Sequence, residues 1–435
     1  MSRKDREIER LTRELRLRDQ RIQHLEKKLL ELEKHLLQYD NPHTPPSQKK
    51  DKPKDQPHKK GKPGRPPGHA GVTRPQATPT QTVTVDADTC PHCQNKLGKA
   101  TKIETQIIEE LPEPQPLTVT EFKIRHYDCP KCGKHVTATD KRLPKEGIFG
   151  PRLLAHINLL KYKYRLTHRK ITEFLKHEYN LKITPATVLD ITRRVSDSLQ
   201  KEYQKVKDSL RKSKASYTDE TGCPVQGTNY WLWGFTTDHE TLIAIRKSRG
   251  KKVLTEILGN KYPGTIISDG HRSYSNYTTN QQRCWSHILR DTQHAAEKYP
   301  EAKPLDKAMH RLYHKLTRRL EHQPPPEERI IIHHQAEATL KRWTTKKYKT
   351  PQVDKVSEKI KTASKSLLTF ITTPGIEPTN NRAERALREH VVIRKIIGTL
   401  RNEKGTRIHE TLMTMLATWK QQNQDPYQMI QTQIS

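Results

Sequence analysis

Three acidic residues in the second half of the chain have the residue types and surroundings of ligands for a divalent cation. Asp219 comes at the end of a short β-prone run, and Asp269 ends a later apolar run in Ser268-Asp269-Gly270. Glu384 follows in the segment P-T-N-N-R-A-E-R-A-L-R. Carboxylate oxygens are the ligands that Mg²⁺ prefers, and two ions held by such ligands can catalyse in-line attack on a phosphodiester. The three acids therefore predict metal-dependent phosphoryl transfer.

The elements around the first two acids predict a ribonuclease H-like α/β fold. The residue patterns indicate three strands, a helix and a further strand, at 215–221, 230–237, 241–246, 250–258 and 264–269. In the ribonuclease H-like order the first and fourth strands are neighbours, so Asp219 and Asp269 would converge from 50 positions apart. Glu220 faces the opposite side of its strand from Asp219, so only one of them can point into the site, and we assign Asp219 to it.

The position of Glu384 has two interpretations. A third oxygen ligand downstream on a helix is what a two-metal site needs. Alternatively, Asn381 with Glu384 is typical of a helix start, and Glu384 with Arg388 forms a stabilising i, i+4 pair. Spacing alone leaves both interpretations open.

The charge of the chain predicts a polyanionic partner. Its 435 residues contain 81 Lys and Arg against 49 Asp and Glu, a formal net charge of +32, which attracts DNA or RNA. A solvated basic surface without such a partner is the alternative. No apolar run approaches the roughly 20 residues that span a bilayer, and the N-terminus has no signal-peptide core, so we expect a cytoplasmic protein without membrane contact.

Four of the six cysteines form two C-x-x-C pairs, in the contexts C-P-H-C and C-P-K-C-G. Tight turns of this kind direct two thiolates at one tetrahedral ion. With strands expected at 105–110 and 117–127, residues 86–145 are predicted to form a zinc ribbon in which Zn²⁺ is structural. Its ligands would be Cys90, Cys93, Cys129 and Cys132. Two unrelated reduced pairs are the alternative.

The N-terminal 40 residues predict a coiled coil. Apolar residues recur at the a and d positions of a seven-residue repeat, with Arg18 as the one polar interruption: Ile8, Leu11, Leu15, Ile22, Leu25, Leu29, Leu32 and Leu36. Because the surrounding residues are nearly all charged, only a narrow seam is available for burial. Self-association to a homodimer or a larger assembly is therefore predicted, with a lone helix packed on the body as the alternative.

Two regions between the coiled coil and the sheet are candidates for DNA contact. Residues 41–85 are proline-rich and basic, which indicates a disordered linker, and Arg65 within it could enter a minor groove as in an AT-hook. Residues 150–212 have helical periodicity, with a helix-turn-helix-like spacing that would place Arg193 and Arg194 on its later helix. A plain linker and a simple helical connector are the respective alternatives.

Six further segments follow one another in order: T-D-E-T-G, Y-W-L-W-G-F, S-D-G-H-R-S-Y, C-W-S-H-I-L-R-D, P-G-I-E-P-T-N-N-R-A-E-R-A-L-R and V-I-R-K-I-I-G-T. With the regions that precede them, these segments closely resemble the transposases of the IS66 family of insertion sequences. The resemblance implies a DDE triad of Asp219, Asp269 and Glu384 that uses Mg²⁺ or Mn²⁺. It also implies a local structural or DNA-contacting role for Cys284-x-x-His287, a motif with too few ligands for a metal site by itself.

The resulting organisation places the catalytic domain at 213–400, with a basic helical insertion at about 290–372 and a C-terminal helical tail at 401–435. Side chains near the third acid are expected to hold the DNA: Arg385, Arg388, Arg394 and Lys395. The expected partners are double-stranded DNA, at element ends and target, and accessory proteins encoded by the element. The expected location is the nucleoid. A nuclease or integrase on the same fold and a non-catalytic DNA-binding regulator are the rival functions.

Overall fold

The computed structural model describes residues 3–39, 77–140, 142–144 and 146–434, so Arg65 and most of the predicted linker lie outside the described residues. The first part contains α1 (Arg3–Tyr39), β1 (His126–Asp128), β2 (His135–Thr137), α2 (Pro151–Tyr162), α3 (His168–Tyr179), α4 (Pro185–Ser198) and α5 (Gln200–Lys212). The sheet region contains β3 (Ala215–Gly222), β4 (Trp231–Thr236), β5 (Thr241–Arg246), α6 (Lys251–Leu258), β6 (Thr265–Ser268), α7 (Arg272–Ser275) and β7 (Gln281–Arg283). The rest contains α8 (Trp285–Lys298), η1 (Pro300–Ala302), α9 (Lys303–Glu321), α10 (Pro326–Thr344), α11 (Pro351–Leu367), α12 (Thr369–Thr372), α13 (Asn381–Ile397), α14 (Glu403–Gln421) and α15 (Pro426–Ile434).

A five-stranded mixed sheet lies at the centre of the fold, which confirms the predicted α/β class. Its strand order is β5-β4-β3-β6-β7. Strands β3, β4 and β5 form an antiparallel meander, whereas β6 pairs with β3 and β7 pairs with β6 in parallel. The predicted strands and the predicted helix of this region match β3, β4, β5, α6 and β6 to within a residue or two.

The edge strand β5 is covered by side chains of α14. Glu410, Thr414 and Thr418 accept hydrogen bonds from the backbone N–H groups of every second residue of β5, over 2.5, 2.9 and 3.2 Å. Four residues of helix advance about 6 Å and two residues of strand nearly 7 Å, so one helix face can follow one strand edge. The helix thereby satisfies an edge that would otherwise remain open to pairing with another chain.

The C-terminal helices α14 and α15, which lie in the predicted helical tail at 401–435, pack on the central body. Helix α14 buries most of its length against β5, and α15 packs on α2. Helices α2 to α5 share one hydrophobic core with the sheet and α14. The predicted tail therefore contributes to this core, where α14 covers the edge of the sheet.

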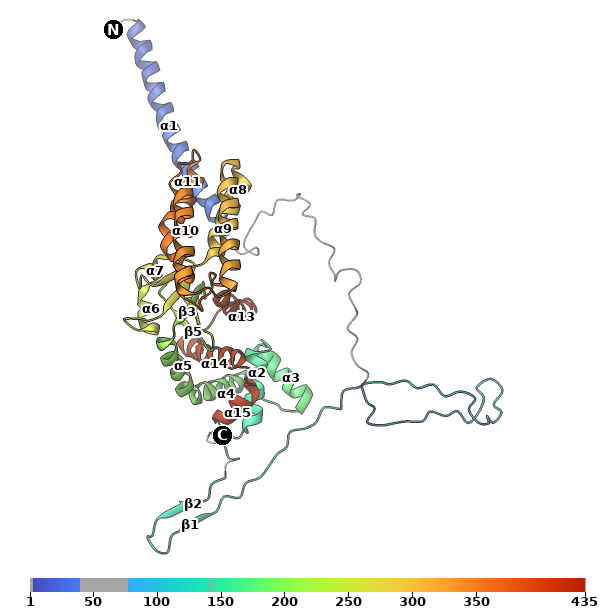
Figure 1. The fold of residues 1–435 in the computed structure, drawn as a ribbon. Coiled ribbons are helices and arrows are strands. Elements are labelled where there is room, and N and C mark those ends of the chain that lie inside the picture. The colour runs from blue at the N-terminus through green and yellow to red at the C-terminus, as the bar shows by residue number, and fades with distance from the viewer. Residues whose placement is uncertain (1–2, 40–76, 141, 145, 435) are drawn as a thin grey trace.

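A second hydrophobic core holds the helices between β7 and α13 together. Helices α8 to α11 pack around it, with Trp285, Met309 and Leu340 among its fully buried side chains. Figure 1 shows these helices at one end of the sheet, with α2 to α5, α14 and α15 at the other end. No helix of the described chain is both long enough and apolar enough to cross a membrane.

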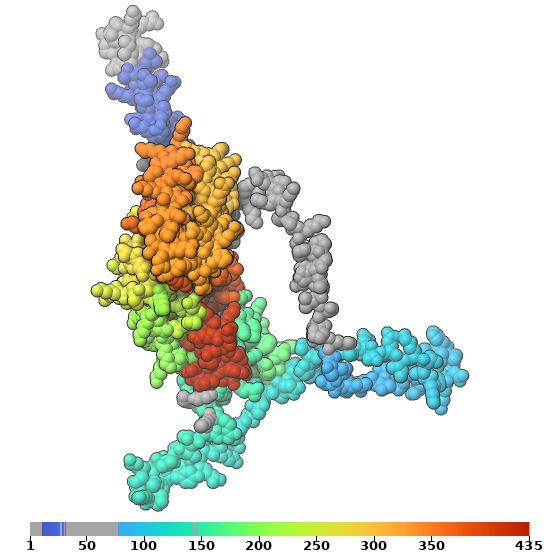
Figure 2. Space-filling model, in the orientation of Figure 1, coloured from blue at the N-terminus to red at the C-terminus, as the bar shows by residue number. Residues whose placement is uncertain are grey.

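Residues 77–140 extend from this body with little regular structure (Figures 1 and 2). The strand expected at 105–110 is not formed, and only the end of the one expected at 117–127 lies in a strand, β1, which makes a short hairpin with β2. Ile103 and Val119 are 87% and 91% exposed. The prediction was wrong because β-prone residues form a strand only where a neighbouring strand pairs with them.

Candidate active site

The parallel pairing of β3 with β6 sets Asp219 and Asp269 side by side. Tyr217 lies opposite Ile267, an offset of 50 residues, and continuing this register by two residues places Asp269 level with Asp219. Asp269 follows the last residue of β6, where its Oδ1 accepts a 2.8 Å hydrogen bond from the backbone N–H of His271. The first two predicted acids therefore meet at one edge of the sheet.

Glu384 reaches this edge from the first turn of α13. The helix packs on the face of the sheet to which Asp219 points. Gly234 lies opposite Asp219, and a Cβ added at Gly234 would stand 2.8 Å from Leu387 Cδ2 of α13. Asp219 and Glu384 are close enough for the charge of Glu384 to raise the pKa of Asp219. The structure thus places Asp219 within electrostatic reach of the other two predicted acids.

The electrostatics of this cluster favour a cation. Burial is the largest cause that raises the pKa of Asp219 well above its usual range, followed by the charges of Glu220 and Asp269. Carboxylates in such proximity repel one another unless a positive charge lies between them. Their oxygens suit Mg²⁺ or Mn²⁺.

Glu220 was predicted only to point away from the site, but its side chain makes specific contacts of its own. Its side chain is fully buried on the opposite side of β3 and accepts hydrogen bonds from the Tyr274 hydroxyl and from Arg249 Nε, the latter over 2.8 Å. Burial and the charge of Asp269 raise the pKa of Glu220, while these two bonds lower it. The alternation of β3 separates the two acids as expected. Asp219 is half-buried, and Glu220 is buried because α7 covers the second face.

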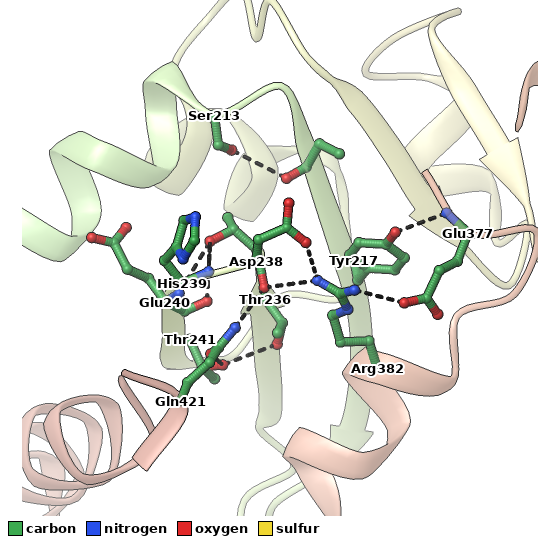
Figure 3. Close-up of polar contacts among 12 residues, drawn as sticks. Ser213, Tyr217, Thr236, Asp238, His239, Glu240, Thr241, Glu377, Arg382 and Gln421 are labelled. Atoms are coloured by element: carbon green, nitrogen blue, oxygen red, sulfur yellow. Dashed lines mark hydrogen bonds and ion pairs between the residues drawn. The ribbon is translucent and has the colours of Figure 1, made fainter. Parts of the chain in front are cut away.

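The start of α13 is fixed by Arg382, as Figure 3 shows. Its guanidinium donates to the Asp238 carboxylate, and through Nη2 to Glu377 Oε1 over 2.6 Å. The same group stacks on Tyr217 with its Cζ 4.6 Å from the ring centre, and the Tyr217 hydroxyl accepts a 2.8 Å hydrogen bond from the backbone N–H of Glu377. Tyr217 precedes Asp219 by two residues, so these contacts hold the helix of Glu384 against the strand of Asp219.

Asn380 makes a second connection that the sequence did not reveal. This residue is fully buried, and its Nδ2 donates a 2.9 Å hydrogen bond to the carbonyl oxygen of Thr218, next to Asp219. Its side chain therefore makes no cap bond to α13, and the helix begins at Asn381. Because Asn380 and not Asn381 is the N-cap, the capping arrangement of Asn381 with Glu384 is not formed. In the sequence, this contact is indicated only by the two adjacent asparagines, Asn380 and Asn381.

The predicted DNA-contacting residues have different environments. Arg385, Arg388 and Lys395 are exposed along one side of α13, and Arg394 is half-buried. Arg193 forms ion pairs with Glu146, Asp190 and Asp197, while Arg194 pairs with Asp190 and its side chain is only 9% exposed. The α13 residues are therefore free to meet a phosphate, whereas the two arginines of α4 would have to exchange their partners.

The two cysteine pairs form matching turns at separate places. A 2.8 Å hydrogen bond runs from Gln94 N to the carbonyl oxygen of Cys90, and an equal one from Gly133 N to that of Cys129. Backbone N–H groups within each turn lower the pKa of the Cys90 and Cys129 thiols. Among the described residues, no ligand cluster joins thiols of both pairs. The structure therefore shows two separate cysteine turns, and the four-cysteine zinc ribbon stays a prediction.

Two buried histidines connect α13 to α14. Nδ1 of His390 lies 3.3 Å from Nε2 of His409, and the ring of Tyr162 packs on His409 with ring centres 5.9 Å apart. Burial, with a smaller effect of the Lys161 charge, lowers the pKa of His409 to about 4, and burial also lowers the pKa of His390. Both rings are therefore neutral in the folded chain near pH 7.

This pair predicts a loss of stability in acid. An unfolded histidine gains its proton near pH 6.5, so the unfolded state binds more protons as the pH falls from about 6.5 toward 4. At pH 5 the cost is about 2 kcal/mol for each imidazole. Denaturant unfolding at pH 7 and pH 5 should therefore show a smaller pH effect for His409→Gln than for the unchanged chain. His322→Gln, at an exposed position, should retain the full effect, and equal pH effects in all three chains would contradict the assignment.

A family model described as "Transposase IS66 family" matches residues 146–408. This range includes all three acids and the sheet, together with α2 to α13. No curated protein matches the chain at a significant level.

Proposed function

The chain belongs to the IS66 family of transposases, and on that premise we propose that it binds insertion-sequence ends and catalyses DNA strand cleavage and strand transfer through Asp219, Asp269 and Glu384. One observation carries the proposal. The three carboxylates converge from β3, β6 and α13, at the edge of a sheet with the strand order β5-β4-β3-β6-β7. This order supports a ribonuclease H-like core, in which such acids form a DDE triad.

The donor set fits a pair of divalent ions, because it consists of carboxylate oxygens that repel one another. Asp219, Asp269 and Glu384 would hold Mg²⁺ or Mn²⁺. When bound, the ions supply an activated water or 3′-hydroxyl and stabilise the leaving oxygen. The chain itself positions the acids: the Asn380 bond to the Thr218 carbonyl and the Arg382 contacts hold the first turn of α13, which carries Glu384, against β3.

The exposed cations of α13 are suited to hold the DNA backbone beside the acids. Arg385, Arg388 and Lys395 lie on the solvent side of the helix whose first turn carries Glu384. Contacts from such side chains to phosphates position the duplex without reading its sequence. We propose further contacts with the element ends from three regions: the linker, the paired arginines of α4, and a ribbon in which the four cysteines bind zinc.

The Glu384→Gln variant provides the direct test. Labelled element ends are incubated with the unchanged chain and the variant, with Mg²⁺ or with a chelator. Cleavage should require metal and should fall by about 10³-fold or more in the variant, because one ligand of the site is lost. Glu297→Gln, at an exposed position of α8, should cleave normally. Full activity of Glu384→Gln would refute the proposal, and cleavage without joining would favour a nuclease.

The coiled coil predicts that the chain acts as a dimer or a larger assembly. Helix α1 is continuous over 37 residues, and Leu11, Leu15, Ile22, Leu25 and Leu29 are exposed along it. A second copy would bury this seam and bring two DNA ends together. Light scattering should therefore give a mass at least twice the 50.7 kDa of one chain. A chain that begins at Pro42 should form an oligomer with fewer subunits. An unchanged number of subunits would exclude α1 as the oligomer interface.

A further inference from the structure

Cys284 and His287 lie beside Glu384, although about 100 residues separate them from it in the sequence. The thiol sulfur, a ring nitrogen of His287 and a carboxylate oxygen of Glu384 all lie within 4.8 Å of one another. The motif C-x-x-H has two ligands in sequence, and the fold supplies a third. Cysteine, histidine and glutamate are all ligands of Zn²⁺.

The backbone holds the first two ligands in register. Cys284 follows β7 directly, and its N–H donates a 2.8 Å hydrogen bond to the carbonyl oxygen of Ser268, the residue before Asp269. It is the N-cap of α8, and His287 lies in the first turn of that helix. Residues three apart in a helical turn share a face, so both side chains are directed to the same side.

The third ligand is fixed against the first two by the loop before α13. The backbone N–H of Asn380 donates to Cys284 Sγ over 3.1 Å, and the backbone N–H of Trp285 donates to the carbonyl oxygen of Pro378 over 3.0 Å. Two helix starts, those of α8 and α13, are therefore joined at this point. The ligands come from a rigid junction and need little rearrangement to close on an ion.

We infer that Cys284, His287 and Glu384 form a binding site for Zn²⁺ or a similar thiophilic cation, distinct from the all-oxygen site of Asp219 and Asp269 but sharing Glu384 with it. Thiolate and imidazole ligands select zinc over magnesium. Three protein ligands leave one tetrahedral position for water or a DNA oxygen. Because Glu384 belongs to both sets, an ion at the new site withdraws it from the catalytic ions. Zinc is therefore an inhibitor of strand cleavage, a consequence that depends on the proposed function.

Titration of the full-length chain with Co²⁺ tests the site without reference to activity. Cobalt bound to a thiolate has a sulfur-to-metal charge-transfer band in the near ultraviolet. Cysteines of the predicted ribbon contribute to that band in every variant, so the difference between the unchanged chain and Cys284→Ser isolates the new site. In Cys284→Ser the intensity of this band should decrease by the contribution of one Co–S bond. Identical spectra would overturn the inference.

Matched variants separate a lost ligand from a damaged fold. Cys223→Ser removes another buried cysteine and should leave the cobalt spectrum unchanged. Asp219→Asn should also retain the Cys284 band, because it alters only the oxygen site. His287→Gln and Glu384→Gln should weaken the cobalt affinity of this site by about tenfold or more. Unaltered affinity in both variants would overturn the three-ligand site.

Zinc inhibition tests the shared ligand. With Mg²⁺ in excess, Zn²⁺ should inhibit cleavage by the unchanged chain, and Cys284→Ser should need about tenfold more zinc for the same effect. Equal sensitivity of the two chains would overturn the competition for Glu384. A chain that binds cobalt through Cys284 but cleaves no DNA would refute the proposed function and leave the metal site standing.

Discussion

Replacing Asp219 with asparagine is expected to reduce strand cleavage by about 10³-fold or more while making the metal-free protein more stable. Catalysis should fall because an amide cannot replace a carboxylate as a charged ligand. Stability should rise because Asp219 is half-buried beside other acids, and burial and the charges of Glu220 and Asp269 raise its pKa. Its ionised form is therefore unfavourable in the folded chain at neutral pH, and the neutral amide removes that cost.

Thermal unfolding with and without Mg²⁺ separates these effects from simple misfolding. Magnesium should raise the unfolding temperature of the unchanged chain, since the ion binds the folded state and offsets the repulsion between carboxylates. The gain should be much smaller in Asp219→Asn. Asp269→Asn should likewise lose cleavage while still binding element ends. Asp86→Asn, in the exposed segment, should behave as the unchanged chain. A fully active Asp219→Asn variant would remove this residue from the site.

Replacing Glu410 with alanine is expected to lower the free energy of unfolding by about 3 kcal/mol. Glu410 Oε1 accepts hydrogen bonds from Ile245 N and from Arg246 Nη1, over 2.5 and 2.6 Å, and the side chain is buried. Alanine leaves the strand N–H without an acceptor and Arg246 with Glu256 as its remaining acidic partner. The edge of β5 would then lose its first contact with α14.

Glutamine at the same position tests which interaction matters. It retains the acceptor for Ile245 N but loses the charge opposite Arg246, so it should cost about 1 kcal/mol. Burial raises the pKa of Glu410, which means that the charge itself is costly to bury and the glutamine variant is spared that cost. Glu403→Ala, exposed on the same helix, should change stability by less than about 0.5 kcal/mol. Denaturant unfolding gives all three values, and equal losses for Glu410→Ala and Glu403→Ala would contradict the edge-covering role.

The sequence by itself was sufficient for the order of strands and helices around the first two acids. Alternating apolar residues and Gly or Pro turns are local signals, and β3 to β6 follow them closely. The α/β class and the IS66 family also followed from the sequence, the family from short motifs in a fixed order. The residue pattern did not predict the structure of residues 101–125 correctly, because the β-prone residues there have no partner strand.

The tertiary structure decided which side chains meet. The parallel register of β3 and β6 sets Asp269 level with Asp219, and the packing of α13 on the sheet brings Glu384 near Asp219. It also shows that Glu220 is buried, that Asn380 bonds the strand instead of capping its helix, and that Cys284 and His287 lie beside Glu384. Such contacts depend on packing between residues tens to more than a hundred positions apart. Local propensity and spacing carry no information about that packing, whereas the folded chain fixes it through shared hydrophobic cores and backbone hydrogen bonds.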